Sequence, residues 1–194
     1  MSTASAGEGI YVGFEVAQER GLTQFVKGIP RTIGEPEDFR TLSITGMYPE
    51  ELAERGLGRH ERRRLTPLVR HIQRRISHLA IVGSTVEPNQ DELVAHKKFA
   101  AIAIDPSEEM VDAREVISGL VLDEIGIKLP NYNPRGWHIS VARRSGRGEK
   151  LPPYRRPIPP SMVVSGITVA IRSAKGDMAN VRDYVNVPRH RWQR

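Results

Sequence analysis

Short strand-like runs alternate irregularly with helical stretches along the chain, and this order constrains the fold more than any other feature. Runs rich in β-branched and aromatic residues lie at 10–16, 39–45, 78–86, 98–104, 137–142 and 162–171. Apolar residues at three- and four-residue spacing predict helices over 49–77 and 105–125, with a shorter helix near 22–26. A doubly wound parallel sheet would need strict alternation of strand and helix. The pattern therefore predicts an α+β fold with antiparallel sheets.

The helix predicted over 105–125 carries its own start and stop signals. Asp105 is placed to cap the helix, Pro106 occupies the first helical position, and Glu108 stands where the acid of a capping box belongs. Gly126 then ends the helical pattern.

Length and composition exclude several classes of protein. The chain has 194 residues, which suits one domain, and contains no cysteine. Disulfide scaffolds, thiolate metal sites, iron–sulfur clusters and cysteine nucleophiles are therefore excluded. No apolar run approaches the roughly 20 residues of a membrane helix, and the N-terminus lacks the layout of a signal peptide. We expect a cytoplasmic protein without a membrane partner.

The same patterns suggest how the chain is divided. We expect a polar leader over 1–9, a single domain over 10–187 and a basic tail over 188–194. The domain would end in a short edge strand at 184–187.

Positive charge is concentrated in the C-terminal third, and most of it is arginine. The net charge is +6, and 23 of the 29 cationic residues are arginine. Residues 135–194 carry a net charge of +10, whereas residues 1–134 carry −4. Because arginine binds phosphate through two parallel hydrogen bonds, this charge predicts a phosphate-bearing partner. A solvated basic surface would explain the same charge.

The common motifs of nucleotide, metal and serine-nucleophile chemistry are missing from the sequence. There is no Walker loop, no H-E-x-x-H and no G-x-S-x-G. The six histidines show no metal-ligand spacing, so we expect neither a metal nor another cofactor. His60, His96 and His190 have polar or basic neighbours, and we interpret them as surface residues.

His138 differs from the other histidines because of the strand on which it lies. Side chains two residues apart on a strand share a face, so His138 and Ser140 project together, opposite Trp137. An imidazole beside a hydroxyl is a compact pair for acid/base work and for holding phosphate. Arg143 and Arg144 follow directly with positive charge. In the alternative interpretation, His138 is a strand histidine held by a backbone carbonyl.

The segment Trp137-His-Ile-Ser-Val-Ala-Arg143 resembles the second H-x-[ST]-x motif of the 2H phosphoesterases. This superfamily contains RNA 2′,3′-cyclic phosphodiesterases and 2′-5′ RNA ligases. The order of elements over residues 10–187 is similar as well. The resemblance implies a bilobal fold in which two antiparallel sheets flank a central cleft, with helices outside. It also implies metal-independent chemistry, in which one histidine acts as base, another as acid, and hydroxyls hold the phosphate.

The first motif of the resemblance is incomplete in this chain. Thr41-Leu-Ser-Ile44 stands in its place, with Ser43 kept and Thr41 where a histidine belongs. A threonine hydroxyl is no general base by itself, and losing one acid/base group typically costs about 10²- to 10⁴-fold in rate. His78 is a candidate replacement, but no hydroxyl follows it at the right position. We interpret His78 as a surface residue at the end of a strand.

These considerations define the predicted site and its ligand. The resemblance implies catalytic roles for His138, Ser140, Thr41 and Ser43. Substrate contacts are expected from Arg135, Arg143, Arg144 and Tyr132, the last by stacking on a base. The expected substrate is a phosphodiester: an RNA end, a 2′,3′-cyclic phosphate or a small (cyclic) oligonucleotide. Two alternatives stay open, namely an inactive nucleotide- or RNA-binding protein on the same scaffold, and an interaction protein in which the motif is incidental. The sequence leaves the oligomeric state open.

Overall fold

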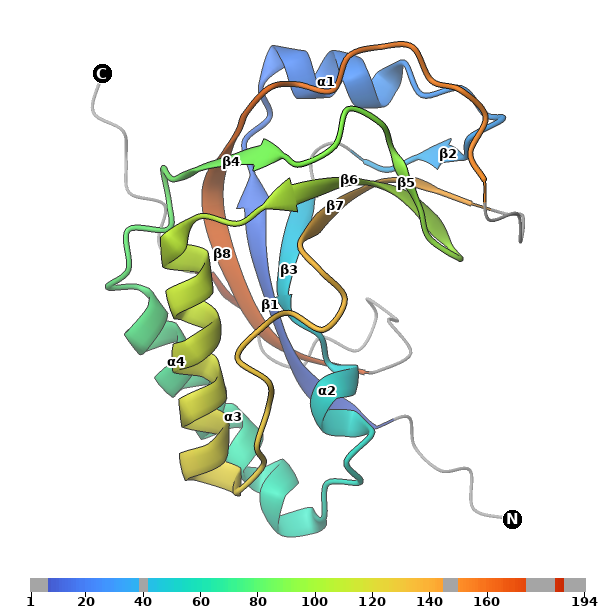
Figure 1. The fold of residues 1–194 in the computed structure, drawn as a ribbon. Coiled ribbons are helices and arrows are strands. Elements are labelled where there is room, and N and C mark those ends of the chain that lie inside the picture. The colour runs from blue at the N-terminus through green and yellow to red at the C-terminus, as the bar shows by residue number, and fades with distance from the viewer. Residues whose placement is uncertain (1–6, 39–41, 145–149, 174–183, 187–194) are drawn as a thin grey trace, which may run out of the picture.

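The computed structural model describes residues 7–38, 42–144, 150–173 and 184–186. Its strands are β1 (Glu8–Val16), β2 (Glu35–Pro36), β3 (Ser43–Met47), β4 (Thr85–Pro88), β5 (Val94–Ala95), β6 (Phe99–Asp105), β7 (His138–Arg143), β8 (Met162–Ser173) and β9 (Tyr184–Asn186). Its helices are α1 (Arg20–Lys27), α2 (Glu50–Ala53), α3 (Arg59–Ile76) and α4 (Glu108–Ile125). Strands fill the middle of the molecule, and α1 lies at the opposite end from α2 (Figure 1).

Antiparallel hydrogen bonding joins the described strands into one sheet. Strand β1 lies between β3 and β8, and β7 lies between β3 and β6. Because β4 pairs with both β6 and β8, these strands close a circuit in the order β1, β8, β4, β6, β7 and β3. The α+β class and the antiparallel pairing are confirmed. The described strands are not divided into two separate sheets as expected, and the two-lobed shape stays a prediction.

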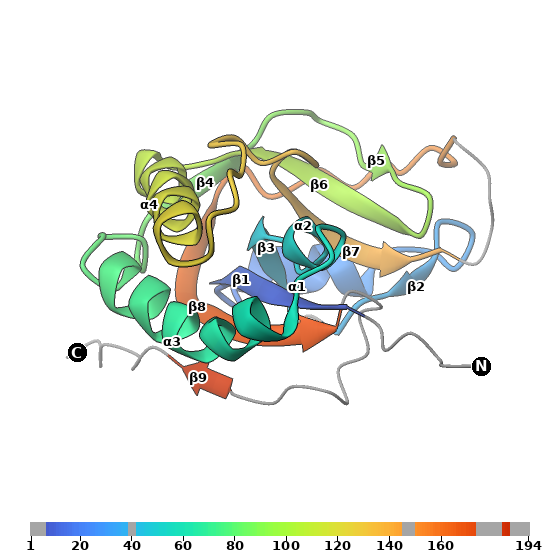
Figure 2. The ribbon, with the colours of Figure 1, turned by 90° about the horizontal axis from the view of Figure 1, so that it is seen from below.

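One face of the sheet is apolar and lies in the core. Ile44 of β3 pairs with Phe14 of β1 and with Ile139 of β7, so these three side chains share a face. All three are fully buried in one hydrophobic cluster, which also contains the apolar stripe of α3: Leu65, Leu68, Val69, Ile72 and Ile76. Helices α3 and α4 pack side by side (Figure 2). The residues that alternate with this apolar set therefore point to the opposite face.

The ends of α4 confirm one predicted signal and correct another. Gly126 ends the helix with φ 71°, a left-handed conformation that favours glycine. The N-cap is Ser107, whose hydroxyl accepts a hydrogen bond from the Met110 N–H, so the prediction of Asp105 as cap was wrong. Asp105 is instead the last residue of β6, which leaves Pro106 outside the helix.

Two other expected elements are shorter than their sequence patterns. The helical stretch over 49–77 is divided into α2 and α3, because the chain turns between them at Gly56 with φ 66°. The strand expected over 78–86 begins only at Thr85, since turns lead from α3 to the sheet. His78 lies in these turns and is exposed, as its interpretation as a surface residue predicted.

At two strands the described residues cover only part of the prediction. The strand expected over 39–45 is seen from Ser43 onward, and Thr41 lies outside the described residues. The expected edge strand at 184–187 is confirmed as β9, which pairs with β8. Within the described part of the chain, no helix is long and apolar enough to cross a membrane.

A buried ion pair connects helices α4 and α2 next to the sheet. Arg114 of α4 is fully buried and forms an ion pair with Glu51 of α2. Its Nε and Nη2 donate to the Pro130 carbonyl at 3.1 and 3.0 Å, and its Nη1 donates to the Gly46 carbonyl at 3.3 Å. The Ser118 hydroxyl also donates to the Pro130 carbonyl, at 3.2 Å. One guanidinium thus connects α4, α2, the end of β3 and the segment that leads into β7.

We expect Arg114→Met to destabilise the protein by about 3–5 kcal/mol, because it leaves the Glu51 carboxylate without its cationic partner and the Gly46 carbonyl without its guanidinium donor. Urea unfolding followed by circular dichroism measures this change. The matched control is Arg64→Met, which removes a half-exposed ion pair with Glu124 and should cost less than about 1 kcal/mol. Equal losses in the two variants would contradict the role given to Arg114.

Candidate functional site

Three of the predicted site residues lie together on the polar face of β3 and β7. Because Ile44 pairs with Ile139, the antiparallel register places Ser43 opposite Ser140, with His138 one step along the same face. On the other side of β7, strand β6 presents Ala101 and Ala103 next to Ser140 and His138.

The ring of His138 is oriented by the turn that precedes β7. Its Nδ1 lies 3.3 Å from the carbonyl oxygen of Gly136, which can only accept, so Nδ1–H is the donor. Gly136 has φ 69°, a conformation that glycine adopts without strain. This contact is the one expected of a strand histidine held by a backbone carbonyl. It uses only one ring nitrogen, however, and leaves Nε2 as a proton acceptor.

Several groups lower the pKa of His138. Burial lowers it most, and His96 and Arg135 lower it further by charge repulsion, while hydrogen bonds to the backbone of Gly136 and Arg135 oppose the shift. The imidazole is therefore neutral at pH 7. A neutral imidazole has the protonation state of a general base.

Two rings from the β5–β6 hairpin cover His138. The His96 ring stacks on it with centroids 4.9 Å apart, and the Phe99 ring with centroids 5.2 Å apart. His138 is consequently only 8% exposed and so is more buried than a residue that lines an open cleft. The cover belongs to a turn whose next residues, Lys97 and Lys98, are exposed.

His96 is the main residue that the sequence analysis missed. Its interpretation as a plain surface residue was wrong, because its ring is partly buried between Phe99 and His138 and burial lowers its pKa. No local pattern marks it, since its position depends on how the β5–β6 hairpin folds back along β7. The pairing of Phe99 with Arg143 shows this register.

A second polar group lies beside Ser43. The hydroxyls of Tyr11 and Ser43 are 2.9 Å apart, and the Tyr11 side chain extends over Gly13, where a Cβ would collide with it. Arg172 of β8 places its guanidinium carbon 3.8 Å from the centre of the Tyr11 ring. The Arg172 Nε is buried and has no hydrogen-bond partner among the described residues. Arg172 lies in the basic C-terminal third of the chain, and no local pattern marks it as a site residue.

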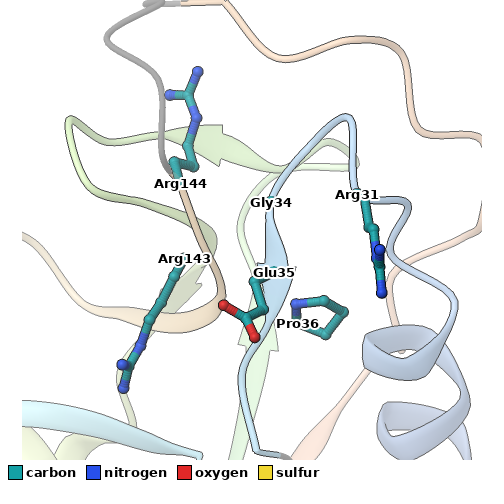
Figure 3. A pocket seen from close by; sticks show the side chains of 6 residues that line it. All are labelled: Arg31, Gly34, Glu35, Pro36, Arg143 and Arg144. Carbon is teal, nitrogen blue, oxygen red and sulfur yellow. The ribbon is translucent and has the colours of Figure 1, made fainter.

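Two of the expected substrate-binding arginines border a pocket at the end of β7. The pocket has a volume of about 650 Å³ and is lined by Arg31, Gly34, Glu35, Pro36, Arg143 and Arg144 (Figure 3). The Arg143 side chain is largely exposed and forms an ion pair with Glu37 at 2.8 Å. Nη1 of Arg144 donates to the His96 carbonyl at 3.1 Å, so this pocket adjoins the turn that covers His138.

The remaining predicted residues do not line this pocket. Arg135 lies over the Tyr48 ring at 4.4 Å and pairs with Glu50 at 3.8 Å. Tyr132 is 71% exposed. No group of three potential metal-binding side chains occurs within the described ranges.

Comparisons with known proteins identify the fold. TT0787 of Thermus thermophilus matches with a TM-score of 0.59 and 14% identity, over 92% of this chain and 97% of that one. A structure named as a phosphoesterase matches with a TM-score of 0.53 and 14% identity, over 94% of this chain and 97% of that one. Escherichia coli LigT complexed with 3′-AMP gives the same values. No family model and no curated protein sequence matches. The resemblance to 2H phosphoesterases is therefore confirmed at the level of the fold.

We expect His96→Gln to raise the pKa of His138, because the substitution removes the repulsion by His96 and opens the cover over the ring. NMR titration of the His138 ring protons measures this shift. His60→Gln is the control, since His60 is exposed on α3 and should leave the titration unchanged. An unchanged pKa of His138 in His96→Gln would show that the two rings are not coupled.

Proposed function

We propose that this protein hydrolyses phosphodiesters by metal-independent acid/base chemistry at His138. The observation that carries the proposal is the placement of the His138 imidazole, whose pKa is lowered, on the same strand face as the hydroxyls of Ser140 and Ser43. The fold likeness to a phosphoesterase, and to LigT crystallised with 3′-AMP, supports the proposed class of reaction. The representative substrate is a 2′,3′-cyclic phosphate at an RNA end or on a nucleotide.

Each polar group has a proposed task in this reaction. Nε2 of His138 accepts a proton from the attacking water, while Ser140 and Ser43 donate hydrogen bonds to phosphate oxygens. Arg172 balances the negative charge of the phosphate from the Tyr11 side of the face. The resemblance assigns Thr41 the positioning of substrate or water.

The cover over His138 sets a condition on this proposal. At 8% exposure, the imidazole meets substrate only when the turn that carries His96 shifts or when the substrate enters along the ring edge. The neighbouring Lys97 and Lys98 are exposed, so the turn lies at the surface of the molecule, although hydrogen bonds to Arg144 and Phe99 hold its backbone.

A binding protein without turnover is the second candidate function. The observation that favours it is Thr41, which replaces an acid/base histidine of the resembled motif. The same hydroxyls and arginines would then hold RNA or an oligonucleotide without cleaving it. A single cytoplasmic domain over 10–187 is part of both proposals.

We expect His138→Ala to lower the turnover of 2′,3′-cyclic nucleotides about 10²- to 10⁴-fold, because it removes the general base. The measurement is product formation across a small panel of cyclic nucleotides and 2′-5′-linked oligonucleotides. His78→Ala is the matched control, since His78 is exposed in a turn away from β7. If the wild-type protein binds these ligands without forming product, and His138→Ala weakens the binding, the result would support the binding function. Unchanged turnover in His138→Ala would refute the proposed base.

We also expect Thr41→His to raise turnover of the same substrates, because it restores the acid/base group that the resembled motif carries. The control is Thr23→His on α1, outside that motif. If Thr41→His is no faster than the wild-type protein, the assignment of Thr41-Leu-Ser-Ile44 to the first motif is not supported.

A further inference from the structure

His96 occupies a position from which it can serve the same reaction as His138. Hydrolysis needs two proton transfers, one from the attacking water and one to the leaving oxygen. We propose that His96 is the second acid/base residue of this site and donates the proton to the leaving oxygen. This inference rests on the proposed phosphodiester hydrolysis and assigns the role that Thr41 cannot fill.

The backbone and the ring of His96 are both held in place. The His96 N–H donates to the Phe99 carbonyl at 2.9 Å, and the His96 carbonyl accepts from Arg144 at 3.1 Å. No hydrogen bond from the His96 ring to another described residue is found. The His96 backbone is thus fixed at its N–H and at its carbonyl, while its ring is held by stacking on Phe99 and His138.

The spacing of the two imidazoles suits one small phosphate. Their centroids lie 4.9 Å apart, with 28° between the ring planes. A catalytic acid and base must each come within about 2.6–3.2 Å of its own oxygen. Two rings at this separation reach two oxygens bonded to one phosphorus, but not two distant groups of a large ligand.

Charge repulsion between the two rings disfavours a pair that carries two protons. Two protonated imidazoles in contact repel each other, so the pair binds its first proton much more readily than its second. Cationic residues flank the pair in the chain, with Lys97 and Lys98 directly after His96 and Arg135 before β7, whereas the acidic Glu35 and Glu37 lie beside Arg143 at the far end of β7. An anionic phosphate offsets this charge and favours the singly protonated pair, which contains one acid and one base.

The proposed step conserves atoms and protons. Water attacks phosphorus and gives its proton to Nε2 of His138, while the bond between phosphorus and the leaving oxygen breaks. Protonated His96 donates its proton to that oxygen, which becomes a hydroxyl. The product is a phosphomonoester. Return of the proton from His138 to His96 through solvent restores the starting state.

Two other roles for His96 would account for its stacking, and variants separate them. His96→Phe keeps an aromatic ring against Phe99 and His138 but carries no proton, whereas His96→Ala removes the cover. If His96 only orients His138, the phenylalanine variant keeps full activity. If His96 only blocks access, the alanine variant is faster than the wild-type protein. If His96 is the acid, both variants lose activity, because neither side chain can donate a proton.

The experiment compares two substrates that differ in their leaving group. For adenosine 2′,3′-cyclic phosphate, we expect kcat to fall about 10²-fold or more in both His96 variants. For bis(p-nitrophenyl) phosphate, whose leaving group needs no proton, both variants should keep turnover near the wild-type level. His138→Ala should be slow on both substrates, because the water still needs a base. His60→Phe, an exposed position on α3, is the control for the aromatic substitution.

Each outcome separates the role of His96 from the proposed function. Wild-type kcat on the cyclic phosphate in His96→Phe, or a faster His96→Ala, would overturn the acid role while leaving hydrolysis at His138 in place. An equal loss on both substrates in the His96 variants would also overturn it, since the defect would not depend on the leaving group. A wild-type protein that hydrolyses neither substrate would overturn the proposed function and the acid role with it.

Discussion

The site depends on the buried guanidinium of Arg114 and its ion pair with Glu51. A fully buried charge is tolerated only when it is paired and its hydrogen bonds are satisfied. The Glu51 carboxylate and the carbonyls of Gly46 and Pro130 supply these partners. Helix α4, helix α2 and the segment before β7 must therefore meet at one point. Any other arrangement would leave either the cation or the carboxylate alone in the core.

That meeting point determines how the chain enters β7. From Pro130 the segment continues to Asn133, whose side-chain amide donates to the Thr45 carbonyl of β3 at 2.8 Å. The turn then closes at Gly136, whose carbonyl orients the His138 ring. The base of the proposed reaction is thus positioned by a chain of backbone contacts that begins in the core. Its rotamer needs no contact with substrate to be set.

Burial lowers the pKa of both His138 and His96, and positive charge from His96 and Arg135 lowers the pKa of His138 further. Such a site favours an anion when few carboxylates compete for its cations. Two carboxylates near the ends of β7, Glu37 and Glu50, are already paired with Arg143 and Arg135. The arginines at the two ends of β7 are therefore partly neutralised.

The local patterns of the sequence were enough to predict the α+β class, the strand character of 137–142, the end of α4 at Gly126 and the shared face of His138 and Ser140. These features follow from residue alternation, helix spacing and glycine geometry, which act between near neighbours in the chain. The predicted N-cap of α4 and the predicted start of the strand over 78–86 were wrong, because pairing in the sheet overrides local preference. His96 and Arg172 could not be predicted as site residues. Their contacts with His138 and Tyr11 join segments more than 40 residues apart, and only the tertiary register of β6, β7, β1 and β8 decides such contacts.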